Sequence, residues 1–238
     1  MNRLTKGCTA ACAVFAANGY TGPAWAQPGD AEAAPAIEIS GNIGLVSDYR
    51  YRGLSLSDRD PAIQGGIDIT HESGLFVGTW ASSIADYGGS NVELDLYGGY
   101  GGQAAGIDYS VSALAYVYPG GHGVDYFELK GTAAKTFGPA TVDLELSWVP
   151  DQKHYRGDNV YVRAGAELAI PDTPLTLSAH AGRESSDFIK KWDWEASAAY
   201  SFDKLTAKLS YVDSDYGGAD EAGRLGRATL VASLVAAF

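Results

Sequence analysis

Residues 91–100 read N-V-E-L-D-L-Y-G-G-Y, and the alternation in this stretch decides the fold. Its valine and two leucines fall on one face of an extended chain, while Glu93 and Asp95 fall on the other. A period of two over this length predicts a β-strand, because a helix would spread both kinds of residue around its circumference. One face of this strand is therefore apolar and the other is acidic.

The same alternation recurs from residue 37 to the end of the chain. It marks the segments 37–50, 61–72, 74–84, 91–101, 106–118, 124–137, 140–149, 158–170, 174–183, 192–202, 204–213 and 226–238. These segments have the length of a tilted strand that spans a bilayer, about 9–11 residues. The sequence therefore predicts an all-β chain of about twelve antiparallel strands.

The connections between these segments alternate in length. Short turns are expected at 73, 102–105, 138–139, 171–173 and 203, a medium connection at 119–123, and long loops at 51–60, 85–90, 150–157, 184–191 and 214–225. Short turns at the periplasmic end and longer loops at the extracellular end are the plan of a transmembrane β-barrel of the outer membrane. A soluble β-sandwich shares the alternation within strands but gives no reason for this asymmetry.

The composition agrees with an aromatic-rich β protein. Among 238 residues there are 30 glycines and 15 tyrosines against one methionine. Only 19% of the residues are charged, which argues against a disordered chain. The net charge of -12 excludes a nucleic-acid binder, because phosphate needs a basic surface.

The first residues have the pattern of an export signal. Two basic residues precede a short apolar stretch, and A-W-A at 24–26 offers the small residues that a signal peptidase recognises. We expect a signal peptide at 1–26, a flexible leader at 27–36 and the barrel at 37–238. Because Cys8 and Cys12 both lie in the signal, the mature chain is expected to have no disulfide.

The last segment ends the chain on an aromatic residue. Leu230, Ala232, Leu234, Ala236 and Phe238 alternate on one face. We expect the terminal strand, with Phe238, to be the signal that the barrel-assembly machinery recognises. Aromatic residues also fall where interfacial girdles are expected, with Tyr49, Trp148, Trp194 and Tyr211 near the long loops and Tyr100, Phe137, Phe202 and Phe238 near the short turns.

The polar faces of the strands carry charges. The candidate pore-lining residues are Asp48, Arg50, Asp68, Glu93, Asp95, Asp108, Glu128, Lys130, Asp143, Glu145, Arg163, Glu167, Asp193 and Glu195, and the same faces include Glu38, Asp125, Lys204, Lys208 and Arg227. A charge on the lipid side costs about 2–4 kcal/mol near the midplane, so these residues should face the lumen. Whether they line water or pair with one another stays open, because a barrel of this size can be open or filled.

Several motifs carry a family resemblance. They are S-D-Y-R-Y-R-G-L-S at 47–55, P-A-I-Q-G-G-I-D at 61–68, H-E-S-G-L-F-V-G-T-W-A-S at 71–82, E-L-D-L-Y-G-G-Y at 93–100 and Y-V-Y-P-G at 116–120. Together they resemble the TorF-type porin family of Gram-negative bacteria, conserved outer-membrane proteins of the Gcw_chp type. The resemblance implies a pore-forming barrel without catalytic residues, and it marks Arg52, Gly53 and Ser55 as a family-motif loop. Leu56 departs from it, standing where a polar residue is expected.

These observations predict a porin-like channel in the cell outer membrane, through which small solutes diffuse passively. Cations should be preferred, because the inward acids outnumber the inward bases. We expect no cofactor, no metal and no catalytic residue. The expected partners are the lipid bilayer, lipopolysaccharide, the barrel-assembly machinery and small solutes, and no nucleic acid.

Two other functions stay open. An outer-membrane enzyme of the lipase, acyltransferase or protease type could use the loop residues His122 and His154, or His180 beside Ser178, although no motif links them. His71 beside Glu72 is a weaker candidate. Alternatively, a barrel with a filled lumen could carry a binding or adhesion role in its loops.

Two loops could bind ligands. The segment 213–221 gathers acids around glycines as a calcium loop does, but it lacks the ligand pattern of an EF-hand. Arg50 and Arg52 either fold into the mouth against Asp48, Asp58 and Asp60, which would narrow it, or hold lipopolysaccharide phosphates.

Overall fold

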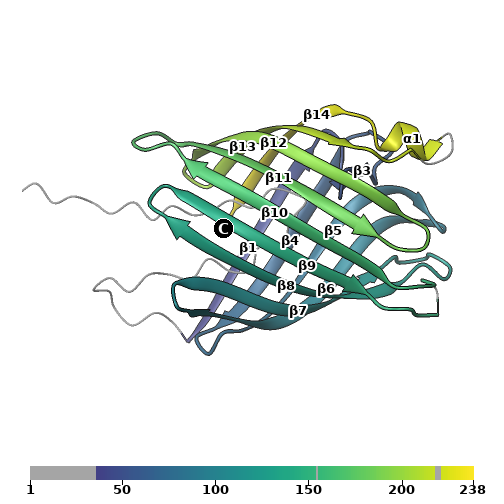
Figure 1. The fold of residues 1–238 in the computed structure, drawn as a ribbon, viewed down its shortest axis with the longest axis horizontal. Coiled ribbons are helices and arrows are strands. Elements are labelled where there is room, and N and C mark those ends of the chain that lie inside the picture. The colour runs from purple at the N-terminus through teal and green to yellow at the C-terminus, as the bar shows by residue number, and fades with distance from the viewer. Residues whose placement is uncertain (1–35, 154, 218–220) are drawn as a thin grey trace, which may run out of the picture.

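The structure is a computed structural model that describes residues 36–153, 155–217 and 221–238. Over these residues, twelve antiparallel strands close into a barrel in which the first strand also pairs with the last (Figure 1). The predicted signal peptide and all but the last residue of the predicted leader lie outside the described residues. No helix within the described ranges is long and apolar enough to cross a membrane.

Each wall strand corresponds to one segment predicted from the sequence. The wall consists of β1 (Ile37–Val46), β4 (Ala62–His71), β5 (Leu75–Tyr87), β6 (Ser90–Ala104), β7 (Ile107–Val117), β8 (Tyr126–Phe137), β9 (Ala140–Val149), β10 (Asn159–Ala169), β11 (Leu175–Ser185), β12 (Lys190–Phe202), β13 (Leu205–Ser214) and β14 (Thr229–Ala237). Two connections contain further elements, the hairpin of β2 (Arg50–Tyr51) and β3 (Leu54–Ser55) and the helix α1 (Glu221–Leu225).

The structure differs from the predicted bounds in several places. The first strand ends at Val46, not at residue 50, because the chain turns into the barrel there. The predicted long loop at 85–90 is a tight turn, since β5 ends at Tyr87 and β6 begins at Ser90, which leaves Gly88 and Gly89 between them with φ angles of 63° and 97°. The helix α1 was not expected in the last long loop.

The outer face of the barrel is an apolar belt. Ile43, Leu144 and Leu209 lie within their strands and are 52%, 58% and 53% exposed. A continuous apolar surface of this kind is suited to lipid rather than water. The predicted girdle residues Trp148, Trp194, Tyr211, Tyr100, Phe137, Phe202 and Phe238 are all exposed. Tyr49 is the exception and that prediction was wrong, because it lies past the end of β1 and is buried.

The barrel closes at the end of the chain. The backbone N–H of Phe238 donates to the carbonyl oxygen of Gly41 (2.9 Å), and the N–H of Gly41 donates to the carbonyl oxygen of Phe238 (2.8 Å). The ring of Phe238 covers Gly41 so closely that a Cβ there would lie 2.7 Å from it. The terminal phenylalanine is therefore part of the seam between β14 and β1.

Candidate functional site

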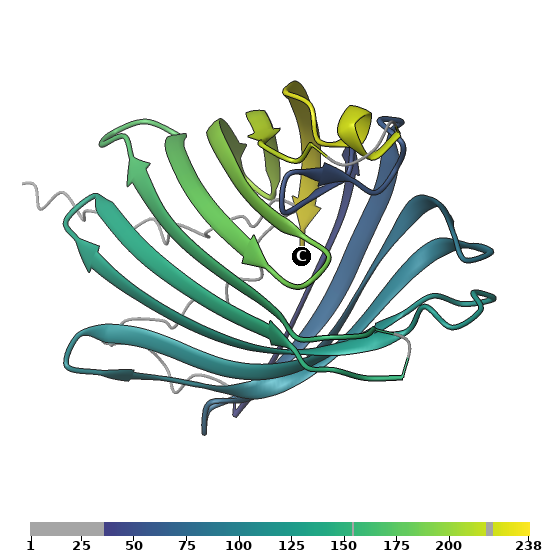
Figure 2. The ribbon, with the colours of Figure 1, turned by 45° about the vertical axis from the view of Figure 1, so that its right-hand side comes forward.

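The connection between β1 and β4, residues 47–61, folds into the barrel at the long-loop end (Figure 2) and is called the inner loop below. Its β2–β3 hairpin turns at Arg52 and Gly53, with φ angles of 49° and 81°. Two successive positive φ angles are those of a tight type I′ turn. A Cβ at Gly53 would lie 2.8 Å from the Cβ of Asp193 on β12, so the tip of the hairpin lies against the wall.

Asp48 organises the inner loop from within. Its carboxylate accepts hydrogen bonds from Arg50 Nε (2.7 Å) and Ser55 Oγ (2.6 Å). Across the loop, Tyr49 N donates to Ser57 Oγ (2.9 Å). Asp48 and Arg50 are both buried, so the predicted contact between them is confirmed and forms a closed ion pair.

Arg50 also joins the inner loop to the last long loop. Its Nη1 donates to the carbonyl oxygens of Leu225 (2.6 Å) and Arg227 (3.2 Å). Arg224 of the same long loop forms an ion pair with Asp58. Two loops separated by more than half of the sequence are thus fastened together at the mouth.

Arg52 reaches the opposite wall, where Glu128, Glu184 and Tyr161 surround its guanidinium. Its Nη2 lies 2.6 Å from Glu128 Oε2, and its Nη1 lies 3.3 Å from Glu184 Oε1. The guanidinium carbon lies 4.7 Å from the ring centre of Tyr51 and 4.3 Å from that of Tyr161. The predicted partners of Arg52 in the mouth, Asp58 and Asp60, were therefore wrong. Burial opposes the charged form of Arg52, but the neighbouring carboxylates outweigh it and raise its pKa well above the ordinary value.

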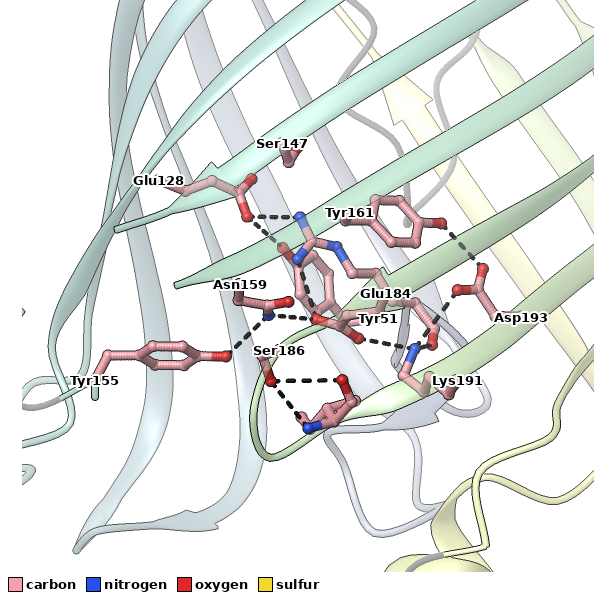
Figure 3. A network of polar contacts seen from close by, with 12 residues as sticks. Tyr51, Glu128, Ser147, Tyr155, Asn159, Tyr161, Glu184, Ser186, Lys191 and Asp193 are labelled. Atoms are coloured by element: carbon pink, nitrogen blue, oxygen red, sulfur yellow. Dashed lines mark hydrogen bonds and ion pairs between the residues drawn. The ribbon is translucent and has the colours of Figure 1, made fainter. Parts of the chain in front are cut away.

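The wall side chains around Arg52 are also held by one another. Glu184 accepts hydrogen bonds from Asn159 Nδ2 (2.7 Å) and pairs with Lys191 Nζ (3.0 Å). Tyr161 donates its hydroxyl to Asp193 (3.0 Å), which also lies 3.5 Å from Lys191 (Figure 3). Lys191 in turn donates to the backbone carbonyl oxygen of Arg52. This network fixes the hairpin tip through its side chain and its backbone.

Tyrosines fill the rest of the long-loop half of the lumen. Tyr49 and Tyr118 donate their hydroxyls to Glu93, at 2.6 and 2.9 Å. The rings of Tyr116 and Tyr126 are stacked with their centres 4.5 Å apart. Burial, and then the negative charge of Glu93, raise the pKa of Tyr49, so it stays a neutral donor.

The two halves of the lumen differ in their lining. Inward residues near the inner loop are mostly buried, whereas many of those nearer the short turns are small or polar and remain partly exposed, with the buried Phe76 as an exception. The second group includes Asn42, Thr70, Ser112, Thr132, Thr141, Thr176, Ser178, Ser197, Ala199, Ser201 and Ser233. These residues face away from lipid, so their exposed surface borders space inside the barrel.

Nine of the fourteen predicted pore-lining charges form ion pairs within the described residues, and several of these pairs join neighbouring strands. Lys130 lies between Glu128 (3.9 Å) and Glu145 (3.6 Å), Arg163 pairs with Asp143 (2.6 Å) and Lys208 pairs with Glu195 (2.7 Å). These pairs lie in the middle of the lumen and neutralise much of the predicted excess of acid.

The remaining predicted acids have other surroundings. Glu93 and Asp95 are buried, and Asp95 Oδ1 has no hydrogen-bond partner among the described residues. Asp68 accepts the hydroxyl of Tyr97 (2.5 Å). Asp108 accepts a hydrogen bond from Gln103 (2.8 Å), and Glu167 is exposed. Asp125, Lys204 and Arg227 were placed wrongly on inward strand faces, because each lies outside the strands and is exposed.

Two buried charges were missed from the sequence. Glu184 and Lys191 were taken as ends of a loop, but β11 and β12 extend to include them. Both continue the inward alternation of their strands, two residues beyond Gly182 and two residues before Asp193. Following the period of two past the predicted strand ends would have found them.

The histidines considered for catalysis lie apart. His180 Nε2 lies 3.7 Å from Asp193 Oδ2, whereas the hydroxyl of Ser178 is hydrogen bonded to Ser197 (2.6 Å). His122 is exposed at the long-loop end, and His154 lies outside the described residues.

The acidic segment 213–221 has local hydrogen bonds where it is described. Asp213 accepts from Ser214 N (2.9 Å), and Asp215 accepts from Trp192 N (2.6 Å). Residues 218–220, and with them Asp220, lie outside the described residues. In the described part of the chain, no group of three or more acids or histidines is placed to hold a metal ion.

A family model agrees with the motifs. The model named Gcw_chp, a bacterial protein of unknown function, matches residues 30–238. The chain belongs to the Gcw_chp family. The comparison with curated proteins gives no match.

Solved structures show which fold the Gcw_chp chain shares. The KdgM porin superposes with a TM-score of 0.59 at 7% identity, covering 84% of this chain and 98% of that one. The NanC porin superposes with a TM-score of 0.56 at 11% identity, covering 84% and 99%. At these identities the likeness concerns the fold, a closed antiparallel barrel of the outer-membrane type. With its apolar belt, the Gcw_chp chain is a protein of the cell outer membrane, as predicted.

Proposed function

We propose that the chain is a porin-like channel through which small solutes diffuse passively across the outer membrane. The two-part lumen carries this proposal. Many inward residues of its short-turn half are small or polar and stay partly exposed, and its long-loop half is narrowed by the inner loop. A barrel that served only as an anchor would have no use for partly exposed polar side chains in its lumen, whereas a channel needs them to line a water-filled path.

We further propose that the channel prefers cations. Each basic side chain that faces the lumen among the described residues has an acidic partner, as Lys130, Arg163 and Lys208 do. Glu38 and Asp108 add negative charge beyond these pairs, since both lie on inward strand faces, are at least partly exposed and form no ion pair within the described residues. An excess of fixed negative charge along a pore favours cations.

The inner loop is the proposed constriction, and its removal tests the channel directly. Val46 is paired with Ala62, so the wall on both sides of the loop is already in register. An Asn-Gly turn in place of residues 47–61 can therefore join β1 to β4, because this dipeptide favours the type I′ turn of a two-residue hairpin. In planar bilayers, the shortened barrel is expected to carry a larger current than the wild type, with a reversal potential that favours cations in a salt gradient.

The control changes rim charge without touching the lumen. Lys153 and Arg156 are exposed at the long-loop end, so their double alanine variant should conduct like the wild type. Equal currents with and without the inner loop would show that it is not the constriction. If neither the folded wild type nor the folded barrel without the inner loop carries a current, the channel is rejected. A barrel with a filled lumen and a binding role in its loops would then be favoured.

We also propose that the barrel has no catalytic activity. The hydroxyl of Ser178 is engaged with Ser197, and His180 faces Asp193, which supports structural roles for these groups in the lumen. Turnover of ester or peptide substrates by the refolded barrel, lost on changing His180 to alanine, would overturn this.

A further inference from the structure

The surroundings of the Arg52 guanidinium have the form of a ligand site. Glu128 and Glu184 supply carboxylate oxygens at 2.6 and 3.3 Å, and Tyr51 and Tyr161 present their rings to its carbon at 4.7 and 4.3 Å. Glu128 is fully buried and Glu184 nearly so. We propose that the two glutamates and Tyr161, here named the cage, form a binding site for the guanidinium group of a cationic solute, occupied in this structure by the chain's own Arg52.

The cage belongs to the wall and does not depend on the inner loop. Glu184 is also held by Asn159 and Lys191, two wall residues whose contacts with it do not involve the Arg52 side chain. Tyr161 is held by Asp193 at one end, and its ring lies so close to Gly182 that a Cβ there would be 2.5 Å from the ring carbon. The site is therefore already shaped for a cation when the hairpin leaves, which lowers the cost of binding one.

The occupant, in contrast, is held at a conformational cost. Arg52 has a φ of 49°, a left-handed conformation that glycine, asparagine and aspartate adopt more readily than arginine. A turn selected only for its backbone would favour those residues. An arginine at this position is explained by what its side chain does in the cage.

The geometry selects a planar cation. Two carboxylates on one edge match the fork of hydrogen-bond donors that a guanidinium presents, and aromatic rings stack on its face. An ammonium group can approach both carboxylates, but it has neither the planar fork of donors nor a face that stacks on the ring. This inference deepens the proposed function, because it names guanidinium compounds as the solutes that the channel recognises at its constriction.

The test removes the Arg52 side chain and supplies a free guanidinium compound in its place. In Arg52→Gly the turn keeps its positive φ and the cage is vacant. The matched control is Arg59→Gly, which removes the same charge from the same loop at another positive φ (69°) but leaves Arg52 in the cage. Binding of ethylguanidinium to each barrel in detergent is measured by titration calorimetry. Ethylammonium is measured in the same way as the comparison ligand.

We expect ethylguanidinium to bind Arg52→Gly at least about tenfold more tightly than it binds Arg59→Gly or the wild type. Adding Glu184→Gln to Arg52→Gly should abolish that gain. Equal binding to Arg52→Gly and Arg59→Gly, or equal binding of both ligands to the vacant cage, would overturn the proposal. If Arg52→Gly does not fold, Arg52→Asn serves the same purpose, because asparagine tolerates this turn.

A parallel bilayer recording separates this inference from the proposed function. If a current passes but ethylguanidinium does not bind, the channel stands and the cage is only a structural ion pair. Binding to the vacant cage by a barrel that never conducts would reject the channel and retain the site.

Discussion

Glu128→Gln is the substitution that tests most directly how the inner loop is held. The Glu128 carboxylate is fully buried and accepts Arg52 at 2.6 Å, with the hydroxyls of Tyr51 and Tyr116 at 3.4 Å each. Glutamine keeps the size and one oxygen acceptor but removes the charge. Glu184, at 3.3 Å, would then be the only carboxylate paired with Arg52.

The magnitude follows from these contacts. Removing one partner of a buried ion pair costs about 3–5 kcal/mol when the other charge is left alone. Because Glu184 remains beside Arg52, we expect about 2–3 kcal/mol less stabilisation of the docked inner loop. At about 1.4 kcal/mol for each factor of ten, the docking equilibrium shifts by about 30- to 150-fold toward the released loop.

Two assays report the released loop. Single-channel recordings should show a larger open fraction, and trypsin should cleave faster at Arg59, which the inner loop carries near the mouth. The control is Glu195→Gln, a buried lumen glutamate paired with Lys208 at 2.7 Å. A folded Glu128→Gln barrel with the open fraction and cleavage rate of the wild type would refute the reasoning that this pair holds the loop.

Three further outcomes are expected. Gly182→Ala should loosen the inner loop and lower thermal stability by about 1–3 kcal/mol, because the added carbon overlaps the Tyr161 ring, and thermal melting checks this. Deleting Phe238 should slow insertion into liposomes containing the assembly machinery, since the residue makes two backbone hydrogen bonds at the seam; unchanged kinetics would exclude it as an assembly signal. Leu144→Arg on the lipid face should cost about 2–4 kcal/mol in unfolding experiments, whereas Ser112→Arg in the lumen should cost far less.

The barrel itself was predictable from sequence because a bilayer permits few alternatives. Leu144 faces lipid and Asp143 faces the lumen, and a period of two between such residues leaves one register for the whole strand. Alternation also identified which charges face inward. It failed at the ends of β11 and β12, where Glu184 and Lys191 follow the pattern but were assigned to a loop.

The path of the inner loop could not be read from its residues. The segment is short, polar and rich in serine and arginine, as an exposed loop also would be. Its position depends on partners remote in sequence, such as the carbonyl oxygen of Leu225 for Arg50 and Glu184 for Arg52. The balance of lumen charge was misjudged for the same reason, because pairing between strands compensates acids such as Glu145, which lies beside both Lys130 and Arg163.

The direct pairing of Val46 with Ala62 separates two evolutionary demands on the chain. The wall must satisfy lipid and assembly, and those requirements change little from one environment to another. Residues 47–61 have to suit the solutes that enter the channel. They can vary in length and chemistry without altering the strands that flank them. The segment behaves as an interchangeable cassette, so related barrels can diverge in what they admit while keeping one architecture, and an engineer can exchange it in the same way.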